Sequence, residues 1–177
     1  RNPPVQPEFL GRTARDVQPI IRQISLGRSA ELKDDDAFER RLFVVRKRAE
    51  NIIRNSALPQ RKFFYIPSLS HRTLIYKGLM IAPQIRGFFP DLVDPRIESA
   101  IAMVHQRYST NTFPTWDLAH PFRFLCHNGE INTVRGNINW MGARQAIASS
   151  PKFAADMAKL FPLIAPGGSD SASLDNA

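Results

Sequence analysis

The sequence has very little cysteine: Cys126 is the only one in 177 residues. A single cysteine cannot form an internal disulfide, which excludes a disulfide-stapled secreted scaffold and favours a reducing, cytoplasmic compartment. No cysteine cluster that would hold an iron–sulfur centre occurs. His105, His120 and His127 have no second ligand at the spacing that a zinc site uses. We therefore expect structural or surface histidines at these positions and no metal.

Long apolar runs are also absent. No run approaches the about 20 residues that a membrane-spanning helix needs, and the first residues lack the basic-then-apolar order of a signal peptide. No Gly-x-Gly-x-x-Gly loop is present. The sequence thus predicts no membrane association and no dinucleotide cofactor bound by this chain.

Acidic residues are fewer than basic ones, 16 against 24, which gives a formal net charge of +8. Clustered cations would favour a nucleic-acid partner. Here many of them are interleaved with Glu39 and Glu50 on a predicted helix, where a solvated charged face is the expected arrangement. The basic residues concerned are Arg40, Arg41, Arg46, Lys47, Arg48 and Arg54. We therefore expect no binding to nucleic acid.

The 43% hydrophobic content is sufficient for the core of one domain. Residues 1–33 carry proline at three of the first seven positions and are expected to be an irregular N-terminal segment. Residues 34–177 are expected to form a helix–strand–helix body. Within it, apolar residues recur at three- and four-residue steps over residues 34–51, behind a run of aspartates, and this pattern predicts a helix.

Short β-prone runs bounded by proline and polar residues follow that helix. They predict strands at residues 63–66, 73–76, 97–104 and 122–126. Further helices are predicted near Pro83, over residues 132–148 and 153–161, and after a cap at Ser169. The order lacks the regular strand–helix alternation of a parallel sheet.

Polar clusters lie at the ends of three predicted elements, at residues 105–107, 127–130 and 168–170, where loops on a rigid scaffold place functional groups. Arg107 offers a planar fork for a carboxylate, and Asp170 accepts hydrogen bonds from an ammonium. Together they would recognise an α-amino acid.

The second cluster offers a different kind of chemistry. The Asn128 amide and the Gly129 N–H, in a tight turn, could both donate to one oxygen and stabilise a tetrahedral intermediate. Plainer interpretations remain open for each cluster: Arg107 as a surface ion pair, Asn-Gly as a hairpin turn, and Asp170 as a helix cap.

Cys126 stands beside His127 and so invites a cysteine–histidine hydrolase hypothesis. Consecutive residues of a strand project to opposite faces, which keeps a thiolate and an imidazole apart. Cys126 would instead share the face of Phe122 and Phe124. We expect a buried apolar thiol and no nucleophile at this position.

The polar clusters belong to longer runs: HQRYSTNTFP at 105–114, HNGEINT at 127–133, GNINWM at 136–141 and SDSASLDN at 169–176. These runs closely resemble the class II glutamine amidotransferase domain of glutamate synthase large (α) subunits. The resemblance covers most of residues 63–177 and is loose before them. It implies an α+β fold, the four-layer αββα sandwich of amino-terminal-nucleophile (Ntn) hydrolases.

The resemblance also implies roles for the polar clusters. Arg107 would bind the α-carboxylate of glutamine and Asp170 its α-amino group, while Asn128 and Gly129 would form the oxyanion hole. The remaining positions that would line the site are Ser109, Thr110 and Glu130. The family's nucleophile is an amino-terminal cysteine, whereas this chain begins Arg1-Asn2. We therefore expect an internal fragment of one amidotransferase domain, truncated at both ends and inactive alone.

The resemblance finally implies a parent enzyme that hydrolyses L-glutamine to L-glutamate and channels the ammonia to 2-oxoglutarate for reductive glutamate synthesis. The family uses FMN and an iron–sulfur cluster, with electrons from NAD(P)H through a small FAD-containing subunit or from ferredoxin. None of these is expected to bind this chain, whose partners would be L-glutamine and the remaining domains of the large subunit. A cytoplasmic location is expected, or a plastid one in a plant or alga. The alternative is a non-catalytic interaction module on the amidotransferase fold.

Overall fold

The longest helix, α2 (Asp35–Arg54), has clear signals at both ends. The Asp34 carboxylate caps it by accepting the backbone N–H of Ala37 at 2.6 Å. Acidic residues occupy its first turn and Arg54 its last, as the helix dipole favours. The helix predicted over residues 34–51 is therefore confirmed and extends slightly further.

The computed structural model describes residues 3–108, 112–128 and 130–177. Besides α2, the helical elements are η1 (Pro7–Phe9), α1 (Arg12–Asp16), η2 (Arg61–Phe63), α3 (Ala82–Phe88), η3 (Pro90–Val93), α4 (Val134–Gln145), η4 (Ala154–Leu160) and α5 (Asp170–Asn176). The helices predicted near Pro83, over 132–148 and after Ser169 are confirmed. The helix predicted over 153–161 forms as the 3-10 helix η4.

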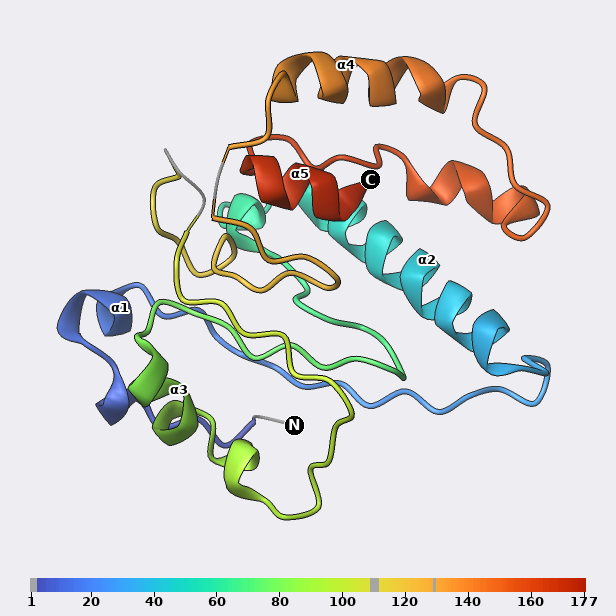
Figure 1. The fold of residues 1–177 in the computed structure, drawn as a ribbon. Helices are drawn as coiled ribbons and strands as arrows, with labels where there is room; N and C mark the ends of the chain where they lie inside the picture. The colour runs from blue at the N-terminus through green and yellow to red at the C-terminus, as the bar shows by residue number, and fades with distance from the viewer. Residues whose placement is uncertain (1–2, 109–111, 129) are drawn as a thin grey trace.

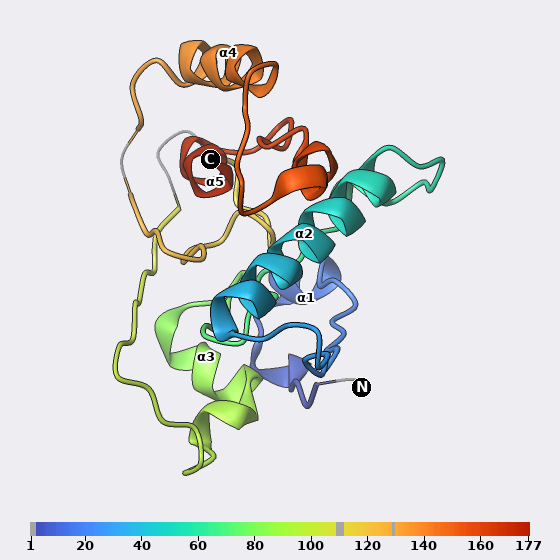
Figure 2. The same ribbon diagram turned by 90° about the vertical axis from the view of Figure 1, so that its right-hand side faces the viewer.

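The helices fall into two groups joined by long extended segments (Figure 1). Helix α4 lies at the end of the molecule opposite α1 and α3, with α5 and η4 between it and α2 (Figures 1 and 2). Helix α2 packs on η4, and α4 packs on α5. This group, α2 with α4, α5 and η4, places the C-terminal part of the chain beside residues 35–54.

No β-strand forms among the described residues, so the strands predicted at 63–66, 73–76, 97–104 and 122–126 are wrong for this structure. A β-prone run becomes a strand only when another segment pairs with it. At 122–126 the chain instead turns back on itself, because the N–H of Phe122 donates to the carbonyl of Leu125 at 2.8 Å. The predicted αββα sandwich is not present in the described residues.

The apolar core lies between α3 and the N-terminal segment. It is centred on the buried residues Leu10, Phe88, Phe89 and Trp116. The rings of Phe88 and Phe89 meet edge to face at 4.6 Å, and that of Phe88 lies 5.7 Å from Trp116. Residues 1–33 are thus not wholly irregular: they form η1 and α1 and contribute Leu10 to the core.

The charged residues of α2 are not all solvated, contrary to the sequence prediction. Arg46, Lys47 and Glu50 are buried, with exposed fractions of 3%, 1% and 5%. Conversely, two apolar residues of the helix, Val45 and Ile52, are exposed at 43% and 59%. The buried face of α2 is therefore substantially polar.

Extended segments beside α2 explain this reversal, because their backbone groups need hydrogen-bond partners. The Lys47 ammonium donates to the carbonyl of Leu163 at 2.5 Å. The Glu50 carboxylate accepts the N–H of Ile66 at 3.2 Å. Burial lowers the pKa of Lys47 to about 8, because a charged ammonium loses its hydration there.

Gly78 is expected to tolerate no side chain. A Cβ at this position would lie 2.3 Å and 2.6 Å from ring atoms of buried Trp116. Gly78→Ala should therefore lower the free energy of unfolding by about 1–3 kcal/mol through overpacking. Urea unfolding followed by tryptophan fluorescence measures the change.

The matched control is Gly142→Ala in α4, where a Cβ meets nothing within 4 Å. Alanine in a helix interior should raise stability by up to about 1 kcal/mol there. Equal unfolding midpoints for the two variants would contradict the packing of Gly78 against Trp116.

Candidate functional site

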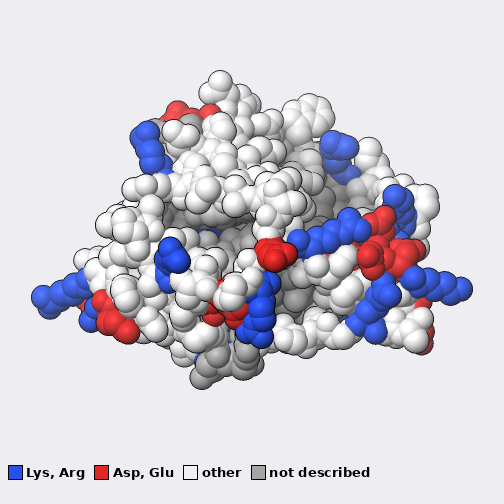
Figure 3. Space-filling view, turned by 60° about the horizontal axis from the view of Figure 1, so that its bottom comes forward, with Lys and Arg blue, Asp and Glu red and all other residues white. Residues whose placement is uncertain are grey.

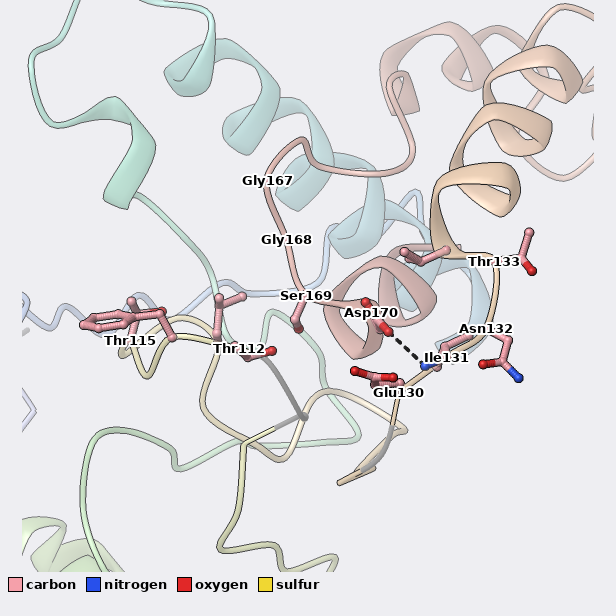
Figure 4. Close-up of a pocket in the computed structure, with 13 residues that line it drawn as sticks. Thr112, Thr115, Glu130, Ile131, Asn132, Thr133, Gly167, Gly168, Ser169 and Asp170 are labelled. Carbon is pink, nitrogen blue, oxygen red and sulfur yellow. Dashed lines mark hydrogen bonds between the residues drawn. The ribbon is translucent and has the colours of Figure 1, made fainter.

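A cavity of about 630 Å³ lies where the loop before Trp116 meets the start of α4 and the start of α5. Its volume is in the range of small-molecule binding pockets. The residues that line it are Thr112, Phe113, Thr115, Leu118, Glu130, Ile131, Asn132, Thr133, Val134, Gly167, Gly168, Ser169 and Asp170. Three segments far apart in the sequence therefore meet around one space (Figure 4).

The start of α5 forms one wall of the cavity. The Ser169 hydroxyl caps the helix by accepting the N–H of Ala172 at 3.2 Å. Asp170 follows in the first turn, and its Oδ2 accepts the backbone N–H of Ile131 at 2.9 Å. This hydrogen bond, drawn in Figure 4, holds two walls of the cavity together.

The start of α4 forms the adjacent wall. Thr133 precedes the helix with a φ of 60°, in the left-handed region that a β-branched residue rarely adopts. Its methyl group packs over Gly136, where a Cβ would lie only 2.8 Å away. The strip from Glu130 to Thr133 thus enters α4 through a backbone conformation that its neighbours must maintain.

The charge of the cavity lining is negative. Glu130 and Asp170 both line it, and among the described residues around it there is no lysine, arginine or histidine. Figure 4 shows the two carboxylates on one side of the space and the Thr112 hydroxyl on the other. Carboxylates accept strong hydrogen bonds from an ammonium group, so this lining suits a ligand with a cationic amine.

The structure brings together only some of the residues predicted for the site. Asp170 and Glu130 line the cavity, whereas Arg107 and Asn128 are exposed and do not line it. The backbone N–H of Arg107 donates to Nδ1 of His105 at 3.1 Å. The predicted site residues Ser109, Thr110 and Gly129 lie outside the described residues.

The sequence did not single out Ile131 and Thr133, although both lie inside the HNGEINT run. Their contribution comes from the backbone: Ile131 supplies an N–H and Thr133 a left-handed turn. Neither is visible in a search for reactive side chains. The local signal for Thr133 is its position directly before α4, which it does not cap through its side chain.

Cys126 does not lie on a buried strand face with its predicted neighbours. Phe122 is 8% exposed but Phe124 is 76% exposed, and Cys126 is half-buried. The reason is the turn at 122–125, which removes the alternation of a strand. The prediction that Cys126 shares a face with both rings is therefore wrong.

His120 is the most strongly perturbed histidine of the region. It is buried, and its ring stacks on that of His105 at 4.5 Å and meets that of Phe122 edge to face at 4.9 Å. Its Nδ1 accepts the backbone N–H of His127 at 3.2 Å. Burial, aided by the nearby His105, Lys77 and His127, lowers the pKa of His120 to about 4.

Where α2 begins, acidic and basic side chains alternate on the surface and do not form separate patches. Asp35 pairs with Arg28 at 2.7 Å and Asp36 with Arg72 at 2.5 Å. Glu39 accepts from His71 at 2.7 Å. On the face shown in Figure 3, basic and acidic side chains lie side by side at this end of the molecule, which differs from the continuous basic stripe of a nucleic-acid interface.

In the part of the chain that the structure describes, no group of three or more histidine, cysteine, aspartate or glutamate residues is arranged to hold a metal ion. No helix of the described residues has both the length and the apolar character needed to cross a membrane.

Comparison with known proteins gives matches along the entire chain. The family model described as "Glutamine amidotransferases class-II" matches residues 1–177. The glutamate synthase (NADPH) large chain of Bacillus subtilis is 49% identical over 177 residues, which are 100% of this chain and 11% of that protein. The corresponding chain of Azospirillum brasilense is 47% identical over 175 residues, 99% of this chain and 11% of that protein.

Plant proteins match as well. The chloroplastic ferredoxin-dependent glutamate synthase of Spinacia oleracea is 40% identical over 177 residues, 100% of this chain and 11% of that protein. The chain thus spans about a tenth of the length of these curated relatives, 11% in each case.

Asp170→Ala should release the backbone of the adjacent cavity wall. Without the carboxylate, the N–H of Ile131 loses its acceptor, and its hydrogen exchange should accelerate about tenfold, as expected for the loss of a hydrogen bond to a charged group. Amide exchange followed by mass spectrometry or NMR measures this. Asp170→Asn keeps an acceptor oxygen and should exchange close to the original rate, and so should the surface control Asp16→Ala. Unchanged exchange at Ile131 in Asp170→Ala would contradict the link.

Proposed function

Because the chain belongs to the class-II glutamine amidotransferases, we propose that it supplies part of a glutaminase site that hydrolyses L-glutamine to L-glutamate and ammonia. The observation that carries the proposal is the cavity lined by Asp170 and Glu130, whose charge suits the α-ammonium of an amino acid. The names of the matched relatives favour an enzyme over a non-catalytic interaction module.

In the proposed complex, Asp170 accepts hydrogen bonds from the α-ammonium of glutamine. Its placement in the first turn of α5, tied to Ile131, fixes the carboxylate toward the cavity. Glu130 adds negative charge beside it. The loop predicted to contain Ser109 and Thr110 leads to Thr112, which lines the opposite side, so these two residues are proposed to line the same site.

Arg107 is proposed to bind the α-carboxylate. Its guanidinium presents parallel N–H groups that match both oxygens of a carboxylate. Arg107 is exposed, and its segment continues into the cavity-lining loop at Thr112. An arginine outside the acidic lining provides the opposite charge that the zwitterionic end of glutamine requires.

Asn128 and Gly129 are proposed to form the oxyanion hole. The Asn128 amide and the Gly129 N–H would donate to the oxygen that becomes negative when the side-chain amide of glutamine is attacked. The nucleophile proposed is the family's amino-terminal cysteine, whose α-amino group acts as the base. Cys126 has no role in this scheme.

The parent protein is proposed to be a glutamate synthase large chain, in which residues 1–33 and 34–177 belong to one amidotransferase domain. There the β-prone runs of this chain would pair within the αββα sandwich. The ammonia would pass to 2-oxoglutarate, with FMN and an iron–sulfur cluster elsewhere in the protein. The relatives are named for NADPH, NADH and ferredoxin. We propose that electrons come from a small FAD-containing subunit or from ferredoxin, and that the parent protein is cytoplasmic or plastidic.

Arg107→Ala in the full-length protein should raise the KM for glutamine about tenfold or more, since each hydrogen bond to a charged group contributes about 1.5–3 kcal/mol. The value of kcat should change much less, because the α-carboxylate does not take part in bond breaking. Steady-state glutaminase assays measure both constants. Arg86→Ala on the exposed side of α3 is the matched control and should leave KM unchanged. A fall in kcat at constant KM would contradict the binding role.

Asn128→Ala should have the opposite signature. Loss of one oxyanion donor lowers kcat by about 10²–10³-fold, while glutamine affinity stays close to its original value. The same assays, together with binding of glutamine at equilibrium, separate the two effects. A variant that weakens only glutamine binding would count against the oxyanion role.

A further inference from the structure

A buried imidazole lies directly behind the proposed oxyanion turn. His120 is 7% exposed, and its Nδ1 accepts the backbone N–H of His127 at 3.2 Å. His127 immediately precedes Asn128, so this hydrogen bond holds the peptide next to the proposed oxyanion donor.

The imidazole is fixed on more than one side. Its ring stacks on that of His105 at 4.5 Å and meets the edge of Phe122 at 4.9 Å. The Lys77 ammonium lies 4.4 Å from the centre of the Phe122 ring and donates to the carbonyl of Asp117 at 2.6 Å. Lys77 is itself buried. The orientation of His120 is therefore determined by packing and not by solvent.

The hydrogen bond also determines the protonation state that His120 needs. A ring nitrogen that accepts a hydrogen bond carries no proton, so Nδ1 must be unprotonated and any proton must lie on Nε2. The groups that face the ring are His105, His127 and Lys77, and all of them disfavour a charged imidazole. The environment thus keeps His120 as a hydrogen-bond acceptor over the range of pH in which enzymes commonly work.

We propose that His120 is a positioning residue for the oxyanion turn: its neutral imidazole holds the His127 N–H and thereby directs Asn128 toward the reacting amide. The inference rests on the proposed glutaminase function. His120 does not act on the substrate, because it works through the backbone of His127.

The kinetic consequence is specific. An oxyanion donor acts mainly in the transition state, so its misplacement lowers kcat and leaves KM nearly unchanged. A shift of about 1 Å in a group that positions reacting atoms can cost about 100-fold in rate. If His120 served only general stability, its substitution would instead lower the amount of active enzyme. The loss would then not depend on whether the new side chain places an acceptor atom at the position of Nδ1.

Two variants of the full-length protein test the acceptor. His120→Leu removes it, whereas His120→Asn places Oδ1 close to the position of Nδ1. We expect kcat for glutamine hydrolysis to fall about 10–100-fold in His120→Leu with KM within about twofold, and to recover most of its value in His120→Asn. His71→Asn, which lies against Glu39 of α2, is the histidine control and should match the unmodified protein.

The pH profile provides a second readout. Protonation of His120 would abolish the acceptor, so the unmodified enzyme should lose kcat as pH falls toward about 4. His120→Asn has no group to protonate at this position and should lose less activity over that range. Identical acid limbs in both proteins would count against the inference.

Hydrogen exchange at the His127 amide makes the test independent of activity. It should accelerate in His120→Leu and stay slow in His120→Asn. Slow exchange in both variants, or equal kcat in both, would overturn the positioning role. If His120→Leu does not fold, His120→Gln replaces it, because its acceptor lies nearer Nε2 and should fail to restore kcat. A full-length protein without glutaminase activity would overturn the proposed function, while the exchange measurement would still decide the role of His120.

Discussion

Side chains of helices pair with the backbone of extended segments, and the rest of the structure depends on this arrangement. A buried N–H or carbonyl without a partner costs about 1–3 kcal/mol, and no sheet among the described residues supplies partners. Helix α2 supplies them: Lys47 to the carbonyl of Leu163, Asn51 to that of Phe161 at 2.9 Å, and Glu50 to an N–H. The polar face of α2 is therefore buried because the backbone groups of the extended segments beside it need hydrogen-bond partners.

Burying cations in this way costs free energy, because each charged group loses its hydration. Neighbouring groups offset part of this cost. Burial lowers the pKa of Arg46 to about 10, and Glu50 partly offsets this from 3.5 Å. Lys77 follows the same pattern, with a carbonyl and two aromatic rings around its buried ammonium. Part of the net charge of +8 is thus internal and structural, which weakens any inference from composition to a charged ligand.

The sequence predicts what is locally determined. The caps at Asp34 and Ser169 lie within three residues of the N–H groups that they accept, so the starts of α2 and α5 could be predicted. The burial of Lys47 could not, because its acceptor at Leu163 lies 116 residues away. The same reason accounts for the strands that were predicted and did not form: pairing is a property of two segments. In the site, the side chain of Asp170 was identifiable, but its bond to Ile131 was not.

The charge of the cavity lining bears on how the proposed site would hold the two ends of an amino acid. Glu130 and Asp170 face one space, and two carboxylates near each other repel unless a cation lies between them. A ligand ammonium relieves that repulsion, while a ligand carboxylate would increase it. In the proposed complex, the lining therefore favours the amine end of an amino acid over its acid end. A group that binds the acid end must lie outside the lining, and Arg107, exposed on the segment leading to it, satisfies that condition.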